Sequence, residues 1–194
     1  MKNNSFYSRY MKTILEFILS LTAVILLAPL MLFIVITIKI DSRGPVIFKQ
    51  SRIGIYQRDF YIYKFRSMVQ NAPQIGTVFT SQGDKRITRV GRILRKTSLD
   101  ELPQLFNVLR GNMSIVGPRP DVRELAYFED PLYNKRFEVK PGITGMAQVY
   151  GRSETTYEQR RDMDANYVDK ISFMLDLKLI MLTAFSVVLR KGVN

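Results

Sequence analysis

The sequence predicts an α+β fold that is mostly helical, with a small β element and one membrane helix near its N-terminus. Three observations support this prediction. An apolar run without a charged residue occupies Phe17–Ile38, and two short runs rich in β-branched and aromatic residues follow it. Further along, apolar residues recur at the spacing of a helix face. The expected division is therefore a membrane helix in residues 1–40 and a membrane-associated domain in residues 41–194.

The apolar run is about 22 residues long, which as a helix gives about 33 Å, close to the ~30 Å hydrocarbon core of a bilayer. Pro29 lies just past its middle and removes a backbone hydrogen bond, so we expect a kink there. A spanning helix collects positive charge on its cytoplasmic side, but here both flanks are basic: Lys2, Arg9 and Lys12 before, and Lys39, Arg43, Lys49 and Arg52 after. We therefore expect a re-entrant helix that enters and leaves one face of the bilayer; a tilted spanning helix is the alternative.

Residues after the membrane run alternate between short apolar runs and turn-rich segments. Val46–Gln50 and Phe60–Phe65 are predicted to be two strands joined by a turn. Gln70–Asp84 is polar and is predicted to be a loop. Asn112–Pro120 and Lys140–Gly145 are interrupted by glycine and proline, and we expect loops there as well.

Three helices are predicted in this second part. One starts near Ser98, which with Glu101 matches the capping-box pattern, and Gly111 ends it. Its apolar face is formed by Leu102, Leu105, Phe106 and Leu109. Tyr157–Tyr167 is a polar helix candidate. Ile171–Leu189 is apolar but contains Asp176 and Lys178, so it is either a buried core helix or an amphipathic helix at the membrane interface.

Charge and composition narrow the classes of function. The chain has 29 Lys+Arg, 17 Asp+Glu and a formal charge of +12, which favours nucleic acid, anionic lipid or phosphorylated substrates as partners. It contains no His and no Cys. These absences exclude cysteine nucleophiles, disulfides, Ser–His triads and the usual zinc sites. A metal bound by oxygen ligands would be Mg²⁺ or a similar hard cation.

Asp100 and Glu101 are the candidate catalytic residues. Both lie in the first turn of a predicted helix, where unpaired N–H groups and the helix dipole favour an ionised carboxylate. An ionised aspartate can attack phosphorus, and the pair can hold Mg²⁺. Acidic residues at helix starts often only stabilise the helix, but this pair has many basic neighbours in the sequence: Arg89, Arg92, Arg95, Lys96, Arg110 and Arg119. Arg119 stands between two prolines, in a rigid loop suited to a bidentate phosphate contact.

Several motifs together resemble the monotopic phosphoglycosyl transferases, bacterial sugar transferases that start the assembly of lipid-linked glycans. The resemblance rests on Tyr63–Met68, Leu99–Gly111, Met113–Pro120, Lys140–Gly145, Ala147–Val149 and Gly151–Arg152. These segments occur in the family's order and cover nearly the whole chain. The length is similar to that of the minimal form, which carries only the catalytic domain.

The resemblance implies an enzyme of the bacterial inner membrane, with its catalytic domain on the cytoplasmic face. Asp100 would attack the β-phosphorus of a UDP-sugar, release UMP and form a phosphosugar–aspartyl intermediate. A polyprenol phosphate, usually undecaprenyl phosphate, would then accept the phosphosugar in the first membrane step of a glycan pathway. Mg²⁺ is implied as the cofactor, with Glu101 and Asp100 as its ligands. The substrate-binding residues implied are Lys64, Arg66, Arg95, Arg119, Gln148 and Arg152.

The chain departs from the family's pattern at a few positions. Ala28 precedes Pro29 where the family has a serine that helps to hold the bend of a re-entrant helix. Thr13 and Glu16 stand where an Arg and an Asp are usual. Met146 and Tyr150 replace a Trp and an Asn, so contacts to the sugar or the uridine are expected to differ there.

Two other functions compete with this interpretation. Asp162-Met163-Asp164 matches the weak Asp-x-Asp metal pattern of nucleotide-sugar glycosyltransferases, but positions i and i+2 of a helix do not share a face. A membrane-tethered basic module that binds nucleic acid or anionic lipid fits the charge. That module would concentrate its basic residues in one stripe, whereas here they are spread along the chain, so we expect no nucleic acid partner. The identity of the sugar, the glycan pathway and the oligomeric state are not readable from the sequence.

Overall fold

The computed structural model describes residues 6–72, 84–151 and 155–188, and confirms a mostly helical α+β fold. In chain order the elements are η1 (Tyr7–Met11), α1 (Lys12–Asp41), β1 (Ile47–Ile53), η2 (Ile55–Gln57), β2 (Asp59–Phe65), α3 (Arg89–Lys96), η3 (Leu99–Glu101), α4 (Gln104–Leu109), β3 (Ser114–Val116), η4 (Arg123–Leu125), α5 (Pro131–Asn134), η5 (Lys135–Glu138), β4 (Gly142–Thr144), α6 (Met146–Tyr150), α7 (Tyr157–Lys170) and α8 (Phe173–Val188). The predicted loop Gln70–Asp84 lies mostly outside the described residues.

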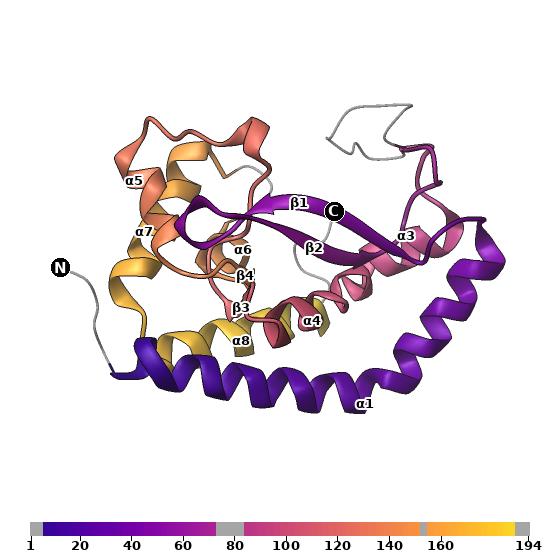
Figure 1. Ribbon diagram of the computed structural model, residues 1–194, viewed down its shortest axis with the longest axis horizontal. Coiled ribbons are helices and arrows are strands. Elements are labelled where there is room, and N and C mark those ends of the chain that lie inside the picture. The colour runs from indigo at the N-terminus through magenta and orange to yellow at the C-terminus, as the bar shows by residue number, and fades with distance from the viewer. Residues whose placement is uncertain (1–5, 73–83, 152–154, 189–194) are drawn as a thin grey trace.

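The membrane helix α1 is longer than the apolar run and bends along its length, as the proline predicted (Figure 1). Pro29 lies inside it and leaves the carbonyl of Ile25 without its helical donor. Within the described residues, α1 is the one helix long and apolar enough to cross a bilayer. Most of its large apolar side chains are exposed, as a helix surrounded by lipid requires.

Both halves of α1 pack against the same domain, which lies on the inner side of the bend (Figure 1). The first half buries a polar stripe at four-residue spacing, Lys12, Glu16 and Ser20. The second half buries Ile34 and Ile38 in an apolar core with Phe65 and Leu94. At the end of the helix, Asp41 Oδ2 accepts a hydrogen bond of 3.0 Å from the backbone N–H of Val90, in the first turn of α3. The domain therefore holds α1 at two separated places.

The two predicted strands form an antiparallel hairpin, β1–β2, in which Ile47 pairs with Phe65 and Ile53 with Asp59. The segments predicted as loops, Asn112–Pro120 and Lys140–Gly145, were only partly loops. Each contains a three-residue strand, and β3 and β4 pair in parallel. Strands this short carry no alternation pattern, and their partner is distant in sequence, so local sequence did not reveal them.

The predicted helix after Ser98 exists, but its start differs. Ser98 adopts a left-handed conformation (φ +55°) and makes no side-chain cap, so the capping box is wrong. A short 3₁₀ turn, η3, comes first, and α4 begins after Pro103. Gly111 ends the helix at φ +76°, as predicted. The confirmed polar helix α7 instead carries a capping box, formed by Thr156 and Gln159.

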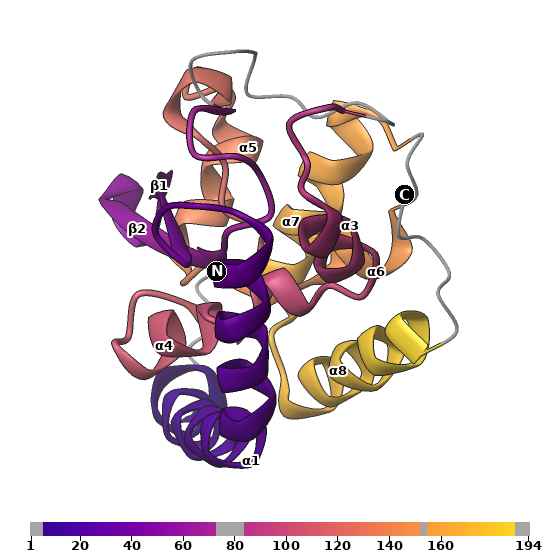
Figure 2. The ribbon, with the colours of Figure 1, turned by 90° about the vertical axis from the view of Figure 1, so that its right-hand side faces the viewer.

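The last helix, α8, is not a buried core helix. Asp176 and Leu179 are buried, whereas Phe173, Met174, Met181 and Phe185 are exposed. Both ribbon views place α8 beside α1 along the lower edge of the molecule (Figures 1 and 2). Its exposed apolar face therefore lies on the same side of the molecule as the membrane helix, which favours the interfacial alternative.

Candidate active site

Glu101 is held by two cations from different parts of the chain. Its Oε1 accepts hydrogen bonds from Lys64 Nζ at 2.6 Å and from an Nη atom of Arg119 at 3.0 Å. Lys64 comes from β2, and Arg119 from the loop after β3. Burial alone would raise the pKa of Glu101, but Arg119 and Lys64 outweigh it and lower the pKa to about 2. The carboxylate is ionised at any physiological pH.

Asp100 behaves differently from its neighbour. It is buried, with 9% of its surface exposed. Burial raises the pKa of its carboxyl, which Lys64 opposes and the charge of Glu101 reinforces. A position at the start of a helix favours the ionised carboxylate, whereas the raised pKa of Asp100 favours the protonated form. The reason is that η3 is a single three-residue turn, which has little dipole to offset the loss of solvent.

The loop that carries Arg119 is fixed through its backbone. The N–H of Gly117 donates to Thr144 O at 2.8 Å, and the N–H of Gly142 donates to Pro118 O at 2.9 Å. Arg52 donates to the carbonyl of Pro120 at 3.1 Å, and Arg136 donates to the carbonyl of Arg119. The side chain of Arg119 is nevertheless 51% exposed. A fixed backbone with an exposed side chain suits a residue that contacts a phosphate from solution.

Gly117 is required at this position by close packing. A Cβ placed there would lie 2.5 Å from Lys140 O and 2.9 Å from Gly142 N, both backbone atoms of the segment around β4. The glycine of the Gly117-Pro118-Arg119-Pro120 motif therefore lets two backbone segments touch, which brings the arginine to Glu101.

Asn107 joins β2 to α4 and is a residue that the sequence did not single out. Its side chain is fully buried. The side-chain nitrogen donates a hydrogen bond to Tyr61 O at 2.7 Å, and the side-chain oxygen accepts one from Tyr63 N at 3.0 Å. These bonds pair two backbone groups of β2 next to Lys64. It lies within the Leu99–Gly111 motif, but nothing in its local pattern distinguishes it from a surface asparagine.

The structure describes three of the other predicted substrate-binding residues, and each has a different environment. Arg95 donates to Ser67 Oγ at 2.8 Å and lies near enough to lower the pKa of Asp100. Arg66 is buried and bonds Ser42 O and Oγ at the end of α1, so it contacts the membrane helix and not Glu101. Gln148 has both amide atoms buried without a hydrogen-bond partner among the described residues. Arg152 lies outside the described residues.

The donor set at Asp100 and Glu101 fits Mg²⁺ only if a substrate completes it. In residues 6–72, 84–151 and 155–188 there is no cluster of three or more acidic, His or Cys residues that would hold a metal alone. Mg²⁺ is commonly bound by one or two carboxylates together with substrate phosphates and water. The two cations on Glu101 both use Oε1, so Oε2 and the Asp100 carboxylate remain as ligands for a metal shared with a diphosphate.

A buried polar network at the start of α1 supports the strand that leads into the Arg119 loop. Lys12 Nζ contacts Glu16 at 2.9 Å, Asp176 at 2.5 Å and the carbonyl of Val116 at 3.0 Å. Glu16 in turn accepts from Ser114 Oγ and from the backbone N–H groups of Ile115 and Val116. The basic partner of Glu16 is therefore Lys12, one position before Thr13, where the family pattern placed an arginine.

The Asp-x-Asp pattern does not form a metal site. Asp164 is buried against Arg136 at 3.0 Å, whereas the side chain of Asp162 is 57% exposed and pairs with Arg161. The two carboxylates belong to different ion pairs on different sides of α7, as the helical spacing predicted.

A known protein family matches the chain over nearly its whole length. The family model described as bacterial sugar transferase matches residues 7–190. The chain belongs to the bacterial sugar transferase family. The match covers both the membrane helix and every residue of the site described above.

Relatives of this bacterial sugar transferase are similar along nearly its whole length. It is 43% identical over 180 residues to a UDP-N-acetylgalactosamine-undecaprenyl-phosphate N-acetylgalactosaminephosphotransferase of Aeromonas hydrophila, covering 90% of this chain and 43% of the relative. It is 46% identical to a UDP-glucose:undecaprenyl-phosphate glucose-1-phosphate transferase of Xanthomonas campestris pv. campestris, covering 93% of this chain and 39% of the relative. The chain thus spans less than half the length of these two proteins.

A third relative matches this bacterial sugar transferase along nearly the whole length of both chains. It is an uncharacterized sugar transferase, EpsL, of Bacillus subtilis, which is 41% identical over 93% of this chain and 91% of its own length.

Proposed function

We propose that this bacterial sugar transferase moves a phosphosugar from a UDP-sugar to a polyprenol phosphate, specifically undecaprenyl phosphate, and releases UMP. The observation that carries the proposal is the buried Asp100 carboxylate beside Glu101, with Lys64 and Arg119 both bound to Glu101. Cations and carboxylates arranged in this way suit a reaction at phosphorus in a diphosphate. The relatives named as undecaprenyl-phosphate sugar phosphotransferases support the same reaction.

The first step is attack by an oxygen of Asp100 on the β-phosphorus of the UDP-sugar. A bond forms between this oxygen and the phosphorus, and the bond from the phosphorus to the bridging oxygen breaks. UMP leaves with the bridging oxygen and its electron pair, and the phosphosugar remains on Asp100 as a mixed anhydride. Lys64 and Arg119 stabilise the negative charge that develops on the phosphate oxygens. Mg²⁺ bound at Asp100 and Glu101 would supply further screening of the diphosphate charge.

The second step regenerates the enzyme. A phosphate oxygen of the lipid acceptor attacks the same phosphorus and displaces the carboxylate of Asp100. The product is a polyprenyl diphosphate sugar, and Asp100 returns to its ionised form. Glu101 remains paired with Lys64 and Arg119 throughout, so its role in this step is to hold these cations in position.

The shape of α1 supports a re-entrant placement of the helix in the cytoplasmic leaflet of the inner membrane. A straight spanning helix leaves one end on the far side of the bilayer, beyond the reach of a single domain. Here both halves of α1 pack on the same domain, through Lys12 and Glu16 at one end and through Ile34 and Ile38 at the other. This geometry favours a domain that stays on the cytoplasmic face, where a lipid phosphate and a soluble UDP-sugar meet.

UMP release tests the proposed function directly. Purified protein with Mg²⁺ and polyprenol phosphate is offered a panel of UDP-sugars, and UMP is quantified. Wild-type protein should release UMP from at least one of them, and Asp100→Asn should abolish the release because an amide is a poor nucleophile. Labelled phosphosugar should be trapped on the wild-type protein and not on this variant. Lys135→Gln, which removes an exposed partner of Asp169, is the control and should retain activity. Full activity in Asp100→Asn would remove this residue from the nucleophile role.

A further inference from the structure

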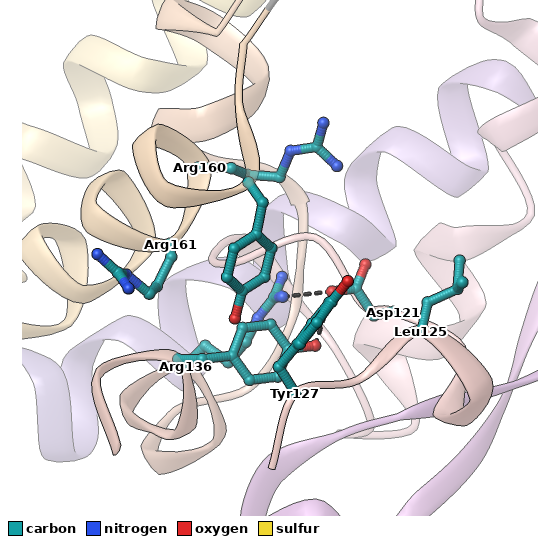
Figure 3. Close-up of a pocket in the computed structure, with 8 residues that line it drawn as sticks. Asp121, Leu125, Tyr127, Arg136, Arg160 and Arg161 are labelled. Atoms are coloured by element: carbon teal, nitrogen blue, oxygen red, sulfur yellow. Dashed lines mark hydrogen bonds and ion pairs between the residues drawn. The ribbon is translucent and has the colours of Figure 1, made fainter. Parts of the chain in front are cut away.

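A cavity of about 190 Å³ is lined by residues of α7 and of the segment that starts at Asp121 (Figure 3). Its walls combine aromatic and basic side chains: Tyr127, Tyr133, Tyr157, Arg136, Arg160 and Arg161. Nothing in the two-step reaction above uses these residues. The combination of aromatic rings with guanidinium groups is common where proteins bind nucleotide bases.

The three tyrosines form one cluster that presents an open ring face. The ring centroids of Tyr127 and Tyr157 are 4.4 Å apart, and those of Tyr133 and Tyr157 are 5.8 Å apart. These rings are in contact, so no flat molecule fits between them. Tyr127, however, is 57% exposed. More than half of its surface is therefore open to a ligand that could stack on the ring.

Two hydrogen-bond donors at the cavity, the Tyr157 hydroxyl and the Arg160 guanidinium, differ from the other two arginines there in their contacts within the described part of the chain. The hydroxyl of Tyr157 is buried and has no hydrogen-bond partner within the described residues. Arg136 is committed to Asp121 and Asp164, and Arg161 to Asp130 and Asp162.

The guanidinium of Arg160 differs from those two arginines, because it makes no ion pair with any described carboxylate. Figure 3 shows the guanidinium groups of Arg160 and Arg161 on different sides of the cavity. Arg160 and the Tyr157 hydroxyl are therefore the donors that a ligand can use.

The cavity is coupled to the reaction centre by a short stretch of backbone. Asp121 lines the cavity and follows Arg119 by two residues, so their Cα atoms are separated by at most about 7.6 Å. Arg136 bridges the two places, because it bonds both the carbonyl of Arg119 and the carboxylate of Asp121. Arg119 thus contacts Glu101 through its guanidinium and Arg136 through its carbonyl.

We propose that this cavity binds the pyrimidine base of the nucleotide donor, which stacks on Tyr127 and accepts hydrogen bonds from Tyr157 and Arg160. This inference rests on the proposed function, since it assigns one part of the UDP-sugar to a place in the fold. Uracil presents two carbonyl oxygens to such donors, whereas cytosine replaces one of them with an amino group. The site should therefore prefer uridine to cytidine nucleotides.

The test measures UMP binding without catalysis. Calorimetric titration of the whole protein with UMP gives an affinity that does not depend on turnover or on the lipid acceptor. Tyr127→Ala should weaken UMP binding roughly tenfold, because a stacking partner is lost. Tyr157→Phe and Arg160→Gln should each weaken it roughly three- to tenfold, the effect of one hydrogen bond. Arg160→Gln should also reduce the preference for UMP over CMP.

Two control variants and a kinetic measurement distinguish a direct effect on UMP binding from a loss of folded structure. Tyr56→Phe changes an exposed tyrosine, and Lys135→Gln an exposed lysine; both should bind UMP like the wild type. In the UMP-release assay the cavity variants should raise KM for the UDP-sugar and leave KM for the lipid acceptor unchanged. A merely structural effect would lower the unfolding temperature and alter both KM values.

The possible results distinguish this inference from the proposed function. Weaker UMP binding in the three cavity variants supports the base site. Unchanged UMP affinity in these variants overturns it, even if wild-type protein releases UMP normally. A raised KM for the UDP-sugar with unchanged UMP affinity would also overturn it, because the cavity would then hold the sugar. Failure of wild-type protein to release UMP from any UDP-sugar would instead refute the proposed function.

Discussion

Replacing Lys12 tests whether the polar network at the start of α1 holds the membrane helix to the domain. In Lys12→Met the cation that faces both Glu16 and Asp176 is lost. All three side chains are nearly buried, with exposures of 11%, 10% and 5%. Removing one partner of a buried ion pair costs about 3–5 kcal/mol because the remaining charge is uncompensated.

The remaining hydrogen bonds place the expected loss at the lower end of that range. In Lys12→Met, Glu16 still accepts hydrogen bonds from Ser114 and from two backbone N–H groups. Asp176 still accepts hydrogen bonds from the hydroxyls of Tyr7 and Tyr167. A loss of about 3 kcal/mol lowers the unfolding temperature by about 6–12 °C in a chain of this size. The measurement is thermal unfolding in detergent, followed by circular dichroism.

Lys39→Met is the matched control on the same helix. Lys39 is exposed, and among the described residues it bonds only the carbonyl of Gly44. The unfolding temperature of Lys39→Met should therefore stay within about 2 °C of that of the wild type. Adding Glu16→Gln to Lys12→Met should recover part of the loss, since one uncompensated charge is then removed. If Lys12→Met unfolded within 2 °C of the wild type, the network would not be what fastens α1 to β3.

Two further predictions concern the reaction centre. Gly117→Ala should nearly abolish UMP release and lower stability, because its Cβ would overlap Lys140 O and Gly142 N. Gly111→Ala is the control: the added Cβ would lie 3.8 Å from its nearest atom, so the variant should lose only about 1–2 kcal/mol from the left-handed backbone and stay active. Burial raises the pKa of Asp100 and Lys64 opposes this, so Lys64→Met should raise the pKa further and move the acidic limb of the kcat/KM profile for UMP release to higher pH. An unmoved limb, or one at lower pH, would contradict this account of the Asp100 environment.

The sequence alone predicted the elements that depend on residues within or next to them. The apolar run and Pro29 predicted a bent membrane helix, since hydropathy and proline act on the chain around them. Short runs rich in β-branched and aromatic residues predicted the hairpin, and the helix stop at Gly111 was correct. The order of motifs around Asp100 and Arg119 predicted the family, which the comparison confirmed.

Only the tertiary structure decided which side chains meet. Lys64 reaches Glu101 across 37 positions and Lys12 reaches Asp176 across 164, so neither contact leaves a local pattern. The same holds for the pairing of β3 with β4, and for Asn107, which resembles any exposed asparagine until the strand lies beside it.

The environment of Asp100 shows the difference most clearly. The sequence supplied a carboxylate at the start of a predicted helix, where an ionised side chain was expected. The fold buried it beside a second carboxylate in a three-residue turn, and its pKa is raised. The chemical identity of a residue is fixed by the sequence, but its charge state depends on desolvation and on neighbours that only folding brings together.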